Sequence, residues 1–382
     1  MAARRKTPPP GIDPDFDRRM MAAALRLGRR NLGHTGTNPA VGCVVVRTDG
    51  DTPVVVGRGW TAESGRPHAE KIALKEAGAK ARGATAYVTL EPCAHEGRAK
   101  PCSKALIDAG VARVVTAISD PDPRTNGEGH AALTEAGVAL TTGVLAVEAE
   151  RAHSAHFDRI TFHHPHVTLK LAVSADGMIG RRTGERMIIT GLPAFEAVQA
   201  MRTHHDTVMI GIGTVLIDNP SLTVRLPGLA KRSPARVILD ATARMPLDSV
   251  LVQSASQTPL IAVVGPEAEE ARKADLAKAG ASIIEVGEGE GGLDLNELLD
   301  ELSERGFTRV FAEGGAEVAA SLISGDLVDE VLIFRAPVVV GADGVRALAG
   351  LALSAIERSP RYRLIDTVAV GEDTMRHYVR TD

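Results

Sequence analysis

The sequence predicts an α/β protein built from two domains. Segments with the β-branched content of strands alternate with segments of helical periodicity, as in layered α/β folds. This pattern runs to about residue 147 and restarts at residue 166. A chain of 382 residues also exceeds what one hydrophobic core usually fills. We therefore expect a disordered tail at 1–14, a first domain at 15–147, a linker at 148–165 and a second domain at 166–382.

The first domain should open with a helix, because apolar residues recur at helical spacing between residues 16 and 32. Strands at 43–47 and 54–60 should form a hairpin through the turn at Asp49-Gly50. The next expected elements are a helix near His68, a strand at 86–90, a helix from Cys102, a strand at 111–118, a helix at 131–136 and a strand from Val138. The turn-rich segment 120–129 could line a pocket, but its composition favours a plain connection.

The region between the two patterned halves starts as a helix and then collects histidines. The irregular spacing of these residues favours an interdomain linker over a second metal site. They are His153, His156, His163, His164 and His166. The second domain should contain a strand at 167–173, a helix at 194–202, strands at 207–212, 237–239, 260–264, 282–286, 310–312 and 331–334, and a closing hairpin at 362–380.

One stretch carries a metal-binding pattern. His68-Ala69-Glu70 is followed by Pro92-Cys93 and Pro101-Cys102. A histidine and two cysteines can hold Zn²⁺ and leave its fourth position to water, whose pKa the metal lowers. A nearby glutamate then moves the proton, as in zinc deaminases. The simpler alternative is two buried cysteines, but two of the chain's three cysteines fall here, each directly after a proline, and we favour zinc.

Two strand-to-loop junctions in the second half are candidate anion sites. Gly213-Thr214 follows one strand, and Gly314-Gly315 leads from another strand into a helix. Backbone N–H groups at a helix start bind phosphate without a basic side chain. The glycine-rich run at 287–292 matches the letters of a dinucleotide fingerprint, but its glutamates would repel a pyrophosphate. We interpret that run as an acidic surface loop.

Composition limits the classes of function. A net charge of -4 with 3% aromatic residues disfavours nucleic acid as a partner, since strand-binding proteins use basic grooves and stacking side chains. We expect no membrane span, because the sequence has no run of about eighteen uncharged apolar residues, and no secretory signal. Few cysteines favour a reducing compartment. We therefore expect a cytoplasmic protein with a small phosphorylated substrate.

Taken together, these motifs resemble the bifunctional deaminase/reductase family of riboflavin biosynthesis. The first half carries Asn38-Pro39-x-Val41-Gly42, His68-Ala69-Glu70, Glu91-Pro92-Cys93-x-His95-x-Gly97-Arg98 and Pro101-Cys102. The second half carries Lys170-x-Ala172-x-Ser174-x-Asp176-Gly177, the segment from Gly213 to Arg225, and Glu313-Gly314-Gly315. The resemblance implies a cytidine-deaminase-like α/β/α layered domain followed by a dihydrofolate-reductase-like α/β domain.

That family deaminates a diaminopyrimidinone carrying a ribosylamino 5′-phosphate and then reduces the sugar with NADPH. Carried over by position, the resemblance implies zinc ligands at His68, Cys93 and Cys102, with Glu70 as the catalytic proton carrier. It implies deaminase substrate contacts at Asn38, His95 and Arg98. It implies a cofactor site at Ser174, Ile188, Thr214, Asp218, Gly315 and Ala316, and a reductase substrate site at Arg202, Leu222, Arg225 and Glu313. We also expect a homo-oligomer.

Several positions depart from the family pattern. Ala99-Lys100 stands where Thr-Pro is common, so that Lys100 would have to replace a hydroxyl near the phosphate. Asp122 stands where asparagine is common, and Ile188, after Arg186 and Met187, where tryptophan is common. Two alternatives stay open. One is a deaminase with a non-catalytic reductase-like domain, and the other is a nucleic-acid-editing deaminase whose second half binds a partner.

Overall fold

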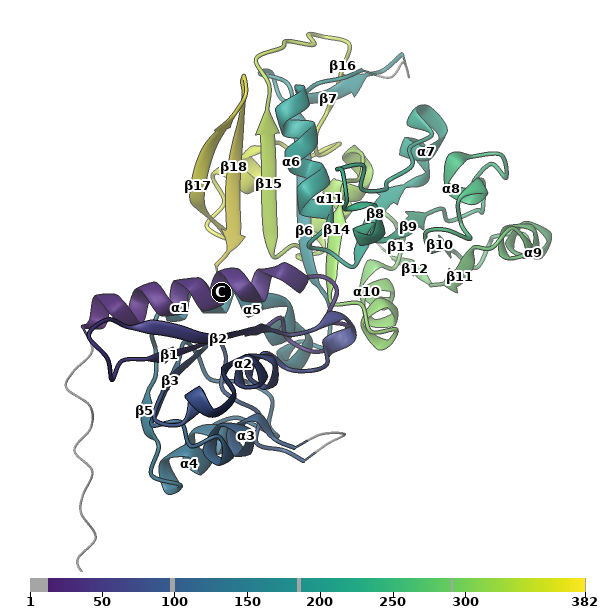
Figure 1. The fold of residues 1–382 in the computed structure, drawn as a ribbon. Coiled ribbons are helices and arrows are strands. Elements are labelled where there is room, and N and C mark those ends of the chain that lie inside the picture. The colour runs from purple at the N-terminus through teal and green to yellow at the C-terminus, as the bar shows by residue number, and fades with distance from the viewer. Residues whose placement is uncertain (1–12, 97–99, 184–186, 290, 382) are drawn as a thin grey trace, which may run out of the picture. The chain divides into compact units, whose positions relative to one another are not determined.

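The computed structural model describes residues 13–96, 100–183, 187–289 and 291–381. The chain divides into two compact units, Met1–Phe162 and His163–Asp382. Each unit is built on its own sheet with helices packed against it (Figure 1), which confirms the predicted fold class. Among the described residues, no helix is long and apolar enough to cross a membrane.

The first unit contains a five-stranded sheet in the order β2-β1-β3-β4-β5. Its strands are β1 (Gly42–Arg47), β2 (Val54–Trp60), β3 (Thr85–Val88), β4 (Arg113–Thr116) and β5 (Ala139–Thr141). Strand β1 is antiparallel to β2 and β3, and β3, β4 and β5 are parallel. The segments that follow β3 and β4 therefore leave the sheet at the same edge, where open α/β sheets place their sites.

Helices cover both faces of this sheet (Figure 1). They are α1 (Pro14–Gly28), α2 (Ala69–Ala77), α3 (Cys102–Asp108), α4 (Glu128–Glu135) and α5 (Ala146–Thr161). Alternating side chains of β1 enter opposite cores: Val44 and Val46 join the core that contains residues of α1 and α5, whereas Cys43 and Val45 join the core under α2, α3 and α4. Glycine lets α2 approach β2 closely, since a Cβ at Gly59 would lie 2.0 Å from a backbone oxygen of α2.

Most of the predicted linker at 148–165 instead belongs to the first unit. Residues 148–161 lie in α5, and the first unit ends at Phe162. His153 and His156 are buried there, and each has a polar partner far away in the sequence, Thr89 and Asp120 respectively. Their spacing of three residues is helical, and burial of both side chains explains why they are not part of a flexible connection.

The second unit contains a nine-stranded sheet in the order β11-β10-β9-β8-β14-β6-β15-β18-β17. Its strands are β6 (His166–Val173), β8 (Thr207–Gly211), β9 (Ala235–Leu239), β10 (Leu260–Val264), β11 (Ser282–Glu285), β14 (Arg309–Ala312), β15 (Glu330–Arg335), β17 (Tyr362–Val370) and β18 (Asp373–Arg380). All are parallel from β11 to β15, and β18 and β17 close the sheet as the predicted antiparallel hairpin.

Helices again pack on both faces of this sheet, over three clusters of buried hydrophobic residues. They are α6 (Leu192–Arg202), α7 (Ile212–Asp218), α8 (Val250–Gln253), α9 (Glu270–Lys278), α10 (Leu295–Glu304), α11 (Ala316–Ser324) and α12 (Ser354–Glu357). Two short pairs complete the unit, β7 (Met178–Arg181) with β16 (Gly344–Arg346) and β12 (Glu288–Gly289) with β13 (Gly292–Leu293). The expected loop at Gly213-Thr214 is the first turn of α7, and the run at 287–292 contributes to β12 and β13.

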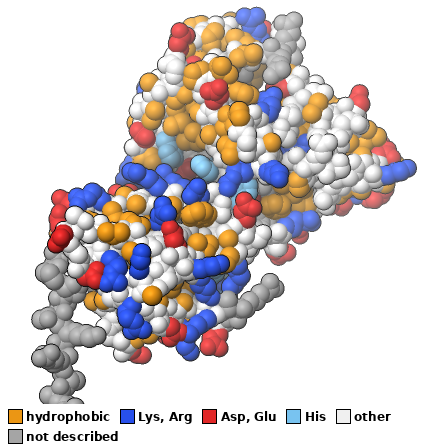
Figure 2. All heavy atoms as spheres, in the orientation of Figure 1, with side chains coloured by type: hydrophobic (Ala, Val, Ile, Leu, Met, Phe, Trp, Pro, Cys, Tyr) orange, Lys and Arg blue, Asp and Glu red, His pale blue; other side chains and the backbone are white. Residues whose placement is uncertain are grey.

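Basic and acidic side chains occur on both units in the face that Figure 2 shows. This mixture agrees with the net charge of -4. With no excess of positive charge over the whole chain, local groups of arginine and helix starts are the features suited to binding an anion.

Candidate active sites

Three side chains with metal-binding atoms meet at the starts of two helices in the first unit. His68 is the N-cap residue of α2, and Cys102 is the first residue of α3. Cys93 follows β3, and its Sγ accepts a hydrogen bond from the backbone N–H of Cys102 at 3.3 Å. Nδ1 of His68 lies 3.7 Å from Sγ of Cys93 and 3.4 Å from Sγ of Cys102. The predicted ligands therefore converge.

This donor set fits Zn²⁺. An imidazole nitrogen and a thiolate bound to one tetrahedral zinc ion stand about 3.6 Å apart, and the two distances from His68 are close to that value. All three ligand atoms lie within 4.8 Å of one another. A hydrogen bond from the Cys102 thiol lowers the pKa of Cys93 to about 4, so Cys93 is ready to bind a cation as the thiolate.

Glu70 lies in the first turn of α2, directly beside these ligands in the chain. It is 3% exposed, and burial raises the pKa of its carboxyl. Glu70 borders a cavity of about 280 Å³ that His68 and Cys93 also border. A buried carboxyl in that position can accept a proton from a bound molecule and return it.

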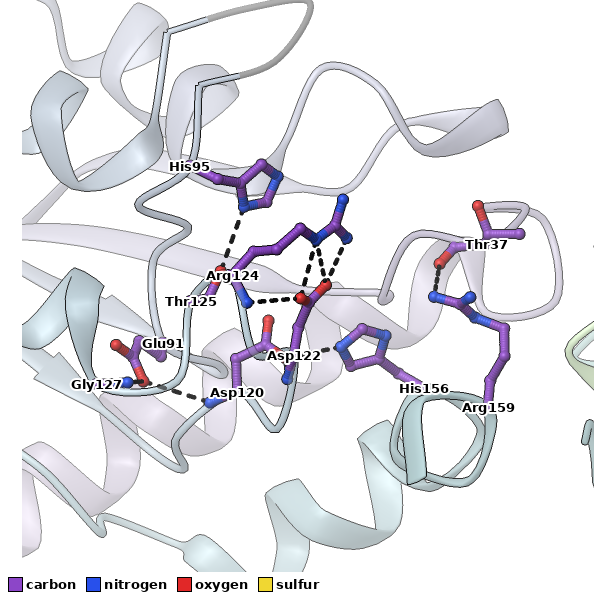
Figure 3. Close-up of polar contacts among 10 residues, drawn as sticks. All are labelled: Thr37, Glu91, His95, Asp120, Asp122, Arg124, Thr125, Gly127, His156 and Arg159. Carbon is purple, nitrogen blue, oxygen red and sulfur yellow. Dashed lines mark hydrogen bonds and ion pairs between the residues drawn. The ribbon is translucent and has the colours of Figure 1, made fainter. Parts of the chain in front are cut away.

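Two of the predicted substrate contacts, Asn38 and His95, lie on the wall of this cavity. Oγ1 of Thr125 lies 3.4 Å from Nδ1 of His95, and this contact helps to fix the orientation of the His95 ring (Figure 3). Arg98 lies outside the described residues. Lys100 forms an ion pair with Asp108 of α3 and does not border this cavity; its role toward the phosphate stays a prediction.

The segment 120–127 also forms part of this wall, which corrects its interpretation as a plain connection. The buried carboxylate of Glu91 holds the segment in place. It accepts hydrogen bonds from the backbone N–H groups of Asp120 at 3.4 Å, Gly127 at 3.1 Å and His130 at 3.1 Å. Figure 3 shows the first two of these bonds. Glu91 therefore links the segment to the strand end that carries Cys93.

Helix α5 supports the same segment. Nε2 of His156 lies 2.9 Å from Oδ1 of Asp120. A second pair lies within the segment itself: Nε of Arg124 donates to Oδ1 of Asp122 at 2.9 Å, and this interaction lowers the pKa of Asp122 to about 2. Arg159, one turn after His156, borders the cavity as well. Neither His156 nor Arg159 was assigned to the site from the sequence, although the helical spacing of positions 153, 156 and 159 was a signal that could have identified this face of α5.

The second unit contains a larger cavity of about 610 Å³ beside the carboxyl ends of β8 and β9. Four of the predicted cofactor residues border it, namely Thr214, Asp218, Gly315 and Ala316. Helix α11 starts at this cavity after Gly315, and no side chain caps its first turn. A Cβ at Gly314 would lie 2.6 Å from Cβ of Val318, so glycine is needed for the tight entry into α11. Free N–H groups there suit a phosphate of a nucleotide.

Two predicted cofactor residues do not border this cavity. Ser174 is fully buried, and its hydroxyl donates to Asp176 at 2.6 Å and accepts the backbone N–H of Met178 at 2.9 Å. Ile188 is 78% exposed, whereas the neighbouring Met187 lies on the wall. The structure thus gives Ser174 a part in holding a turn, and it leaves Ile188 at the surface.

A buried ion pair follows the end of β14. Arg202 donates from Nε to Oε1 of Glu313 at 2.5 Å and from Nη2 to Oε2 at 3.0 Å. Burial opposes ionisation of Glu313, but Arg202, helped by Lys170, outweighs it and lowers the pKa of Glu313. Burial lowers the pKa of Lys170 on β6. No role was assigned to Lys170 from the sequence, although a lysine inside a mostly apolar strand could have marked it as a candidate site residue.

Leu222 and Arg225 complete the predicted reductase substrate set. Leu222 is 5% exposed and has a φ of 56°. The guanidinium of Arg225 lies over the ring of Phe195, 5.0 Å from its centroid. Arg225 also donates its backbone N–H to Oε1 of Gln199 at 2.7 Å. Its charged group is therefore held at the surface, where an anion can reach it.

Both halves match known protein families. Residues 14–118 match the cytidine and deoxycytidylate deaminase zinc-binding region, and residues 165–375 match the RibD C-terminal domain. The first match includes the His68, Cys93 and Cys102 cluster, and the second includes the cavity beside α11.

Relatives with similar sequences cover nearly the whole chain. It is 36% identical to the riboflavin biosynthesis protein RibD of Aquifex aeolicus over 366 residues, which is 96% of this chain and 99% of that protein. It is 36% identical to the RibD of Escherichia coli over 370 residues, with 95% and 99% covered.

Solved structures agree with these relatives. Acinetobacter baumannii RibD is 33% identical with a TM-score of 0.83, covering 97% of this chain and 100% of that one. The diaminohydroxyphosphoribosylaminopyrimidine deaminase/5-amino-6-(5-phosphoribosylamino)uracil reductase of Thermotoga maritima is 30% identical with a TM-score of 0.82, covering 96% and 99%.

Proposed function

Because this chain belongs to the RibD family of riboflavin biosynthesis and is a bifunctional deaminase and reductase, we propose that it acts in two steps on a phosphorylated pyrimidine. The first unit deaminates 2,5-diamino-6-ribosylamino-4(3H)-pyrimidinone 5′-phosphate. The second unit reduces the ribosyl group with NADPH, which gives 5-amino-6-ribitylaminouracil 5′-phosphate. The name of the Thermotoga maritima relative, which states both activities, supports this assignment. The homo-oligomeric state and the cytoplasmic location stay predictions.

In the deamination step, His68, Cys93 and Cys102 would hold Zn²⁺. When bound, the ion supplies a Lewis acid that makes water a nucleophile at neutral pH. Glu70 moves two protons in succession: its carboxylate takes one from water and delivers it to the pyrimidine ring nitrogen, and it then takes the proton of the new hydroxyl group and delivers it to the departing ammonia. The convergence of three metal-binding atoms with this buried carboxyl at one cavity is the observation that carries the proposal. Asn38 and His95 orient the ring, and Arg98 contacts the phosphate.

In the reduction step, the start of α11 and the Thr214 hydroxyl bind the cofactor, with Asp218 on the same wall. NADPH supplies the hydride when bound, so the protein has to align it with C1′ of the opened sugar. Arg202 and Glu313 position the sugar, and Leu222 precedes Thr223, whose carbonyl oxygen accepts a hydrogen bond from Arg202. Arg225 binds the substrate phosphate, since its guanidinium is exposed and held over Phe195.

Removing zinc with a chelator is expected to abolish deamination and to leave the reductase rate unchanged, because the ligands and the cofactor cavity belong to different units. Ammonia release and NADPH absorbance should be followed on one preparation, before chelation, after chelation and after Zn²⁺ is added back. Full deamination by the metal-free protein would contradict the proposed role of the cluster. If the deaminated product causes no NADPH consumption, the second unit is non-catalytic.

Changing Arg225 to alanine is expected to raise the KM of the reductase for the deaminated substrate more than it lowers kcat, because a phosphate contact stabilises the ground state and the transition state alike. Loss of one charge-assisted hydrogen bond corresponds to an increase of about tenfold or more. Arg225→Lys should retain part of the affinity, since the charge remains. Steady-state kinetics at saturating NADPH measures both constants, and an unchanged KM for Arg225→Ala would refute the assignment.

A further inference from the structure

Helix α5 presents polar side chains to the deaminase cavity region at every third position. His153 is 2% exposed, and its Nε2 lies 3.1 Å from Oγ1 of Thr89. His156 and Arg159 border the cavity itself. Figure 3 shows both rising from the same helix, with Arg159 directed toward Thr37. The helix therefore supplies part of the cavity wall as well as part of the hydrophobic core.

Most charged side chains on this wall already have partners inside the protein. Asp120 is paired with His156, and Asp122 is paired with Arg124. Glu91 accepts hydrogen bonds from backbone N–H groups of the segment 120–130. Both Asp120 and Asp122 are buried, so separating either pair would leave a buried carboxylate without its partner, even though the Arg124 guanidinium itself is exposed. They are consequently poor candidates for binding a charged ligand.

Arg159 differs from them. Its Nη2 donates to the carbonyl oxygen of Thr37 at 3.2 Å, which is a neutral acceptor. Its Nε is buried and has no hydrogen-bond partner among the described residues. Burial lowers the pKa of this guanidinium, which indicates a cation partly removed from water and not fully compensated. A guanidinium in that state gains more from an anion than a solvated one does.

The burial of the lining residues distinguishes the closed end of the cavity from its open end. Glu70 is 3% exposed and borders the cavity together with His68 and Cys93, so the proton carrier and these two metal-binding residues form its floor. Thr37 and Arg66 are exposed and Arg159 is half-buried, so these residues form its rim. A molecule whose ring reacts at the floor has to extend its far end toward this rim. In the proposed substrate, the far end is the phosphate of the sugar.

We propose that Arg159 binds the phosphate group of the deaminase substrate, so that α5 recognises the phosphorylated end of the molecule. This inference rests on the proposed deaminase function and adds to it a phosphate contact from a helix near the end of the first unit. The competing explanation is structural, namely that Arg159 only fixes the segment at Thr37. A structural role would affect phosphorylated and dephosphorylated substrates alike, whereas a phosphate contact affects only the first.

The test compares the full-length wild type with Arg159→Gln on the phosphorylated substrate and on the same compound after phosphatase treatment. For Arg159→Gln, KM for the phosphorylated compound should rise about 10- to 100-fold, as expected for loss of a charge-assisted hydrogen bond. Its kcat and its KM for the dephosphorylated compound should stay at the wild-type values. Arg151→Gln is the matched control, since Arg151 is exposed on the same helix, and it should change neither KM.

Two results would overturn the inference: an unchanged KM of Arg159→Gln for the phosphorylated compound, or an equal rise for both compounds. Zinc content and melting temperature of the same samples report whether the first unit is folded. If Arg159→Gln does not fold, Arg159→Lys replaces it, because it keeps the charge but loses the planar fork, and the same selective rise in KM is required. If the wild type releases ammonia from neither compound, the proposed function itself fails.

Discussion

Replacing Glu70 with glutamine is expected to abolish ammonia release while zinc stays bound. Glutamine has nearly the same volume, and Glu70 lies outside the set of three metal-binding atoms, so the cluster of His68, Cys93 and Cys102 should stay intact. What is lost is a group that can hold a proton. General acid–base groups contribute about 10²- to 10⁴-fold, and Glu70 is the buried carboxyl that borders the cavity beside the ligands. We therefore expect kcat of deamination to fall by at least ~10²-fold.

Three measurements on one sample make this prediction specific. Zinc content should equal that of the wild type, the reductase rate should be unchanged, and ammonia release should be lost. Glu76→Gln is a suitable control, because Glu76 lies on the same helix but pairs with Arg58 at the surface. Loss of zinc together with activity would mean that Glu70 supports the metal cluster, and retained deamination would mean that another group moves the proton.

The order of secondary structure was predictable because burial in these sheets follows simple periodicities. In β1, the predicted alternation corresponds to two separate cores, with Val44 on one face and Cys43 on the other. Parallel strands such as β10 are buried throughout and appear in the sequence as continuous apolar runs. In both cases the position of each residue in the core can be recognised from its immediate neighbours in the sequence.

The metal-binding cluster was predictable for a different reason. Cysteine is rare in this chain, with three residues in all, and two of them share a segment with unusual proline neighbours. Side chains with a specific chemistry leave a signal even when the fold is unknown. The substrate wall left only a weaker signal, the helical spacing of positions 153, 156 and 159. The pairing of His156 with Asp120, across 36 positions, exists only in the folded chain.

Carrying residues over by position also has a physical limit. Ser174 stands at an expected cofactor position, yet it is fully buried, and its hydroxyl donates to Asp176 and accepts the backbone N–H of Met178. Whether a polar group is available to a ligand depends on its local hydrogen bonds, and these are decided by backbone geometry. The residues that do border the cofactor cavity, such as Gly315, are placed there by a helix start, which the strand-glycine-helix pattern did predict.

The second large effect is expected for Glu313→Ala, which should abolish the reductase and destabilise the second unit. Both partners are buried, since the side chain of Arg202 is 8% exposed and that of Glu313 is 9% exposed. Removing the carboxylate leaves Arg202 buried without its anion and leaves Lys170 without the charge that favours its protonated form. Breaking a buried pair from one side costs about 3–5 kcal/mol. Because Arg202 also donates to the carbonyl oxygen of Thr223 at 3.1 Å, the substrate segment should lose its support.

Glu313→Gln separates the two consequences. Glutamine keeps the volume and can still accept one hydrogen bond from Arg202, so calorimetry should show a smaller loss of stability than for Glu313→Ala. It cannot neutralise two cations, so the reductase rate, followed by NADPH absorbance, should fall for both variants. Ammonia release should stay at the wild-type rate in each, because the metal-binding cluster lies in the other unit. A stable Glu313→Ala variant with a normal reductase rate would show that the ion pair neither supports the fold nor serves the site, and the half-buried position of Lys170 would then need another explanation.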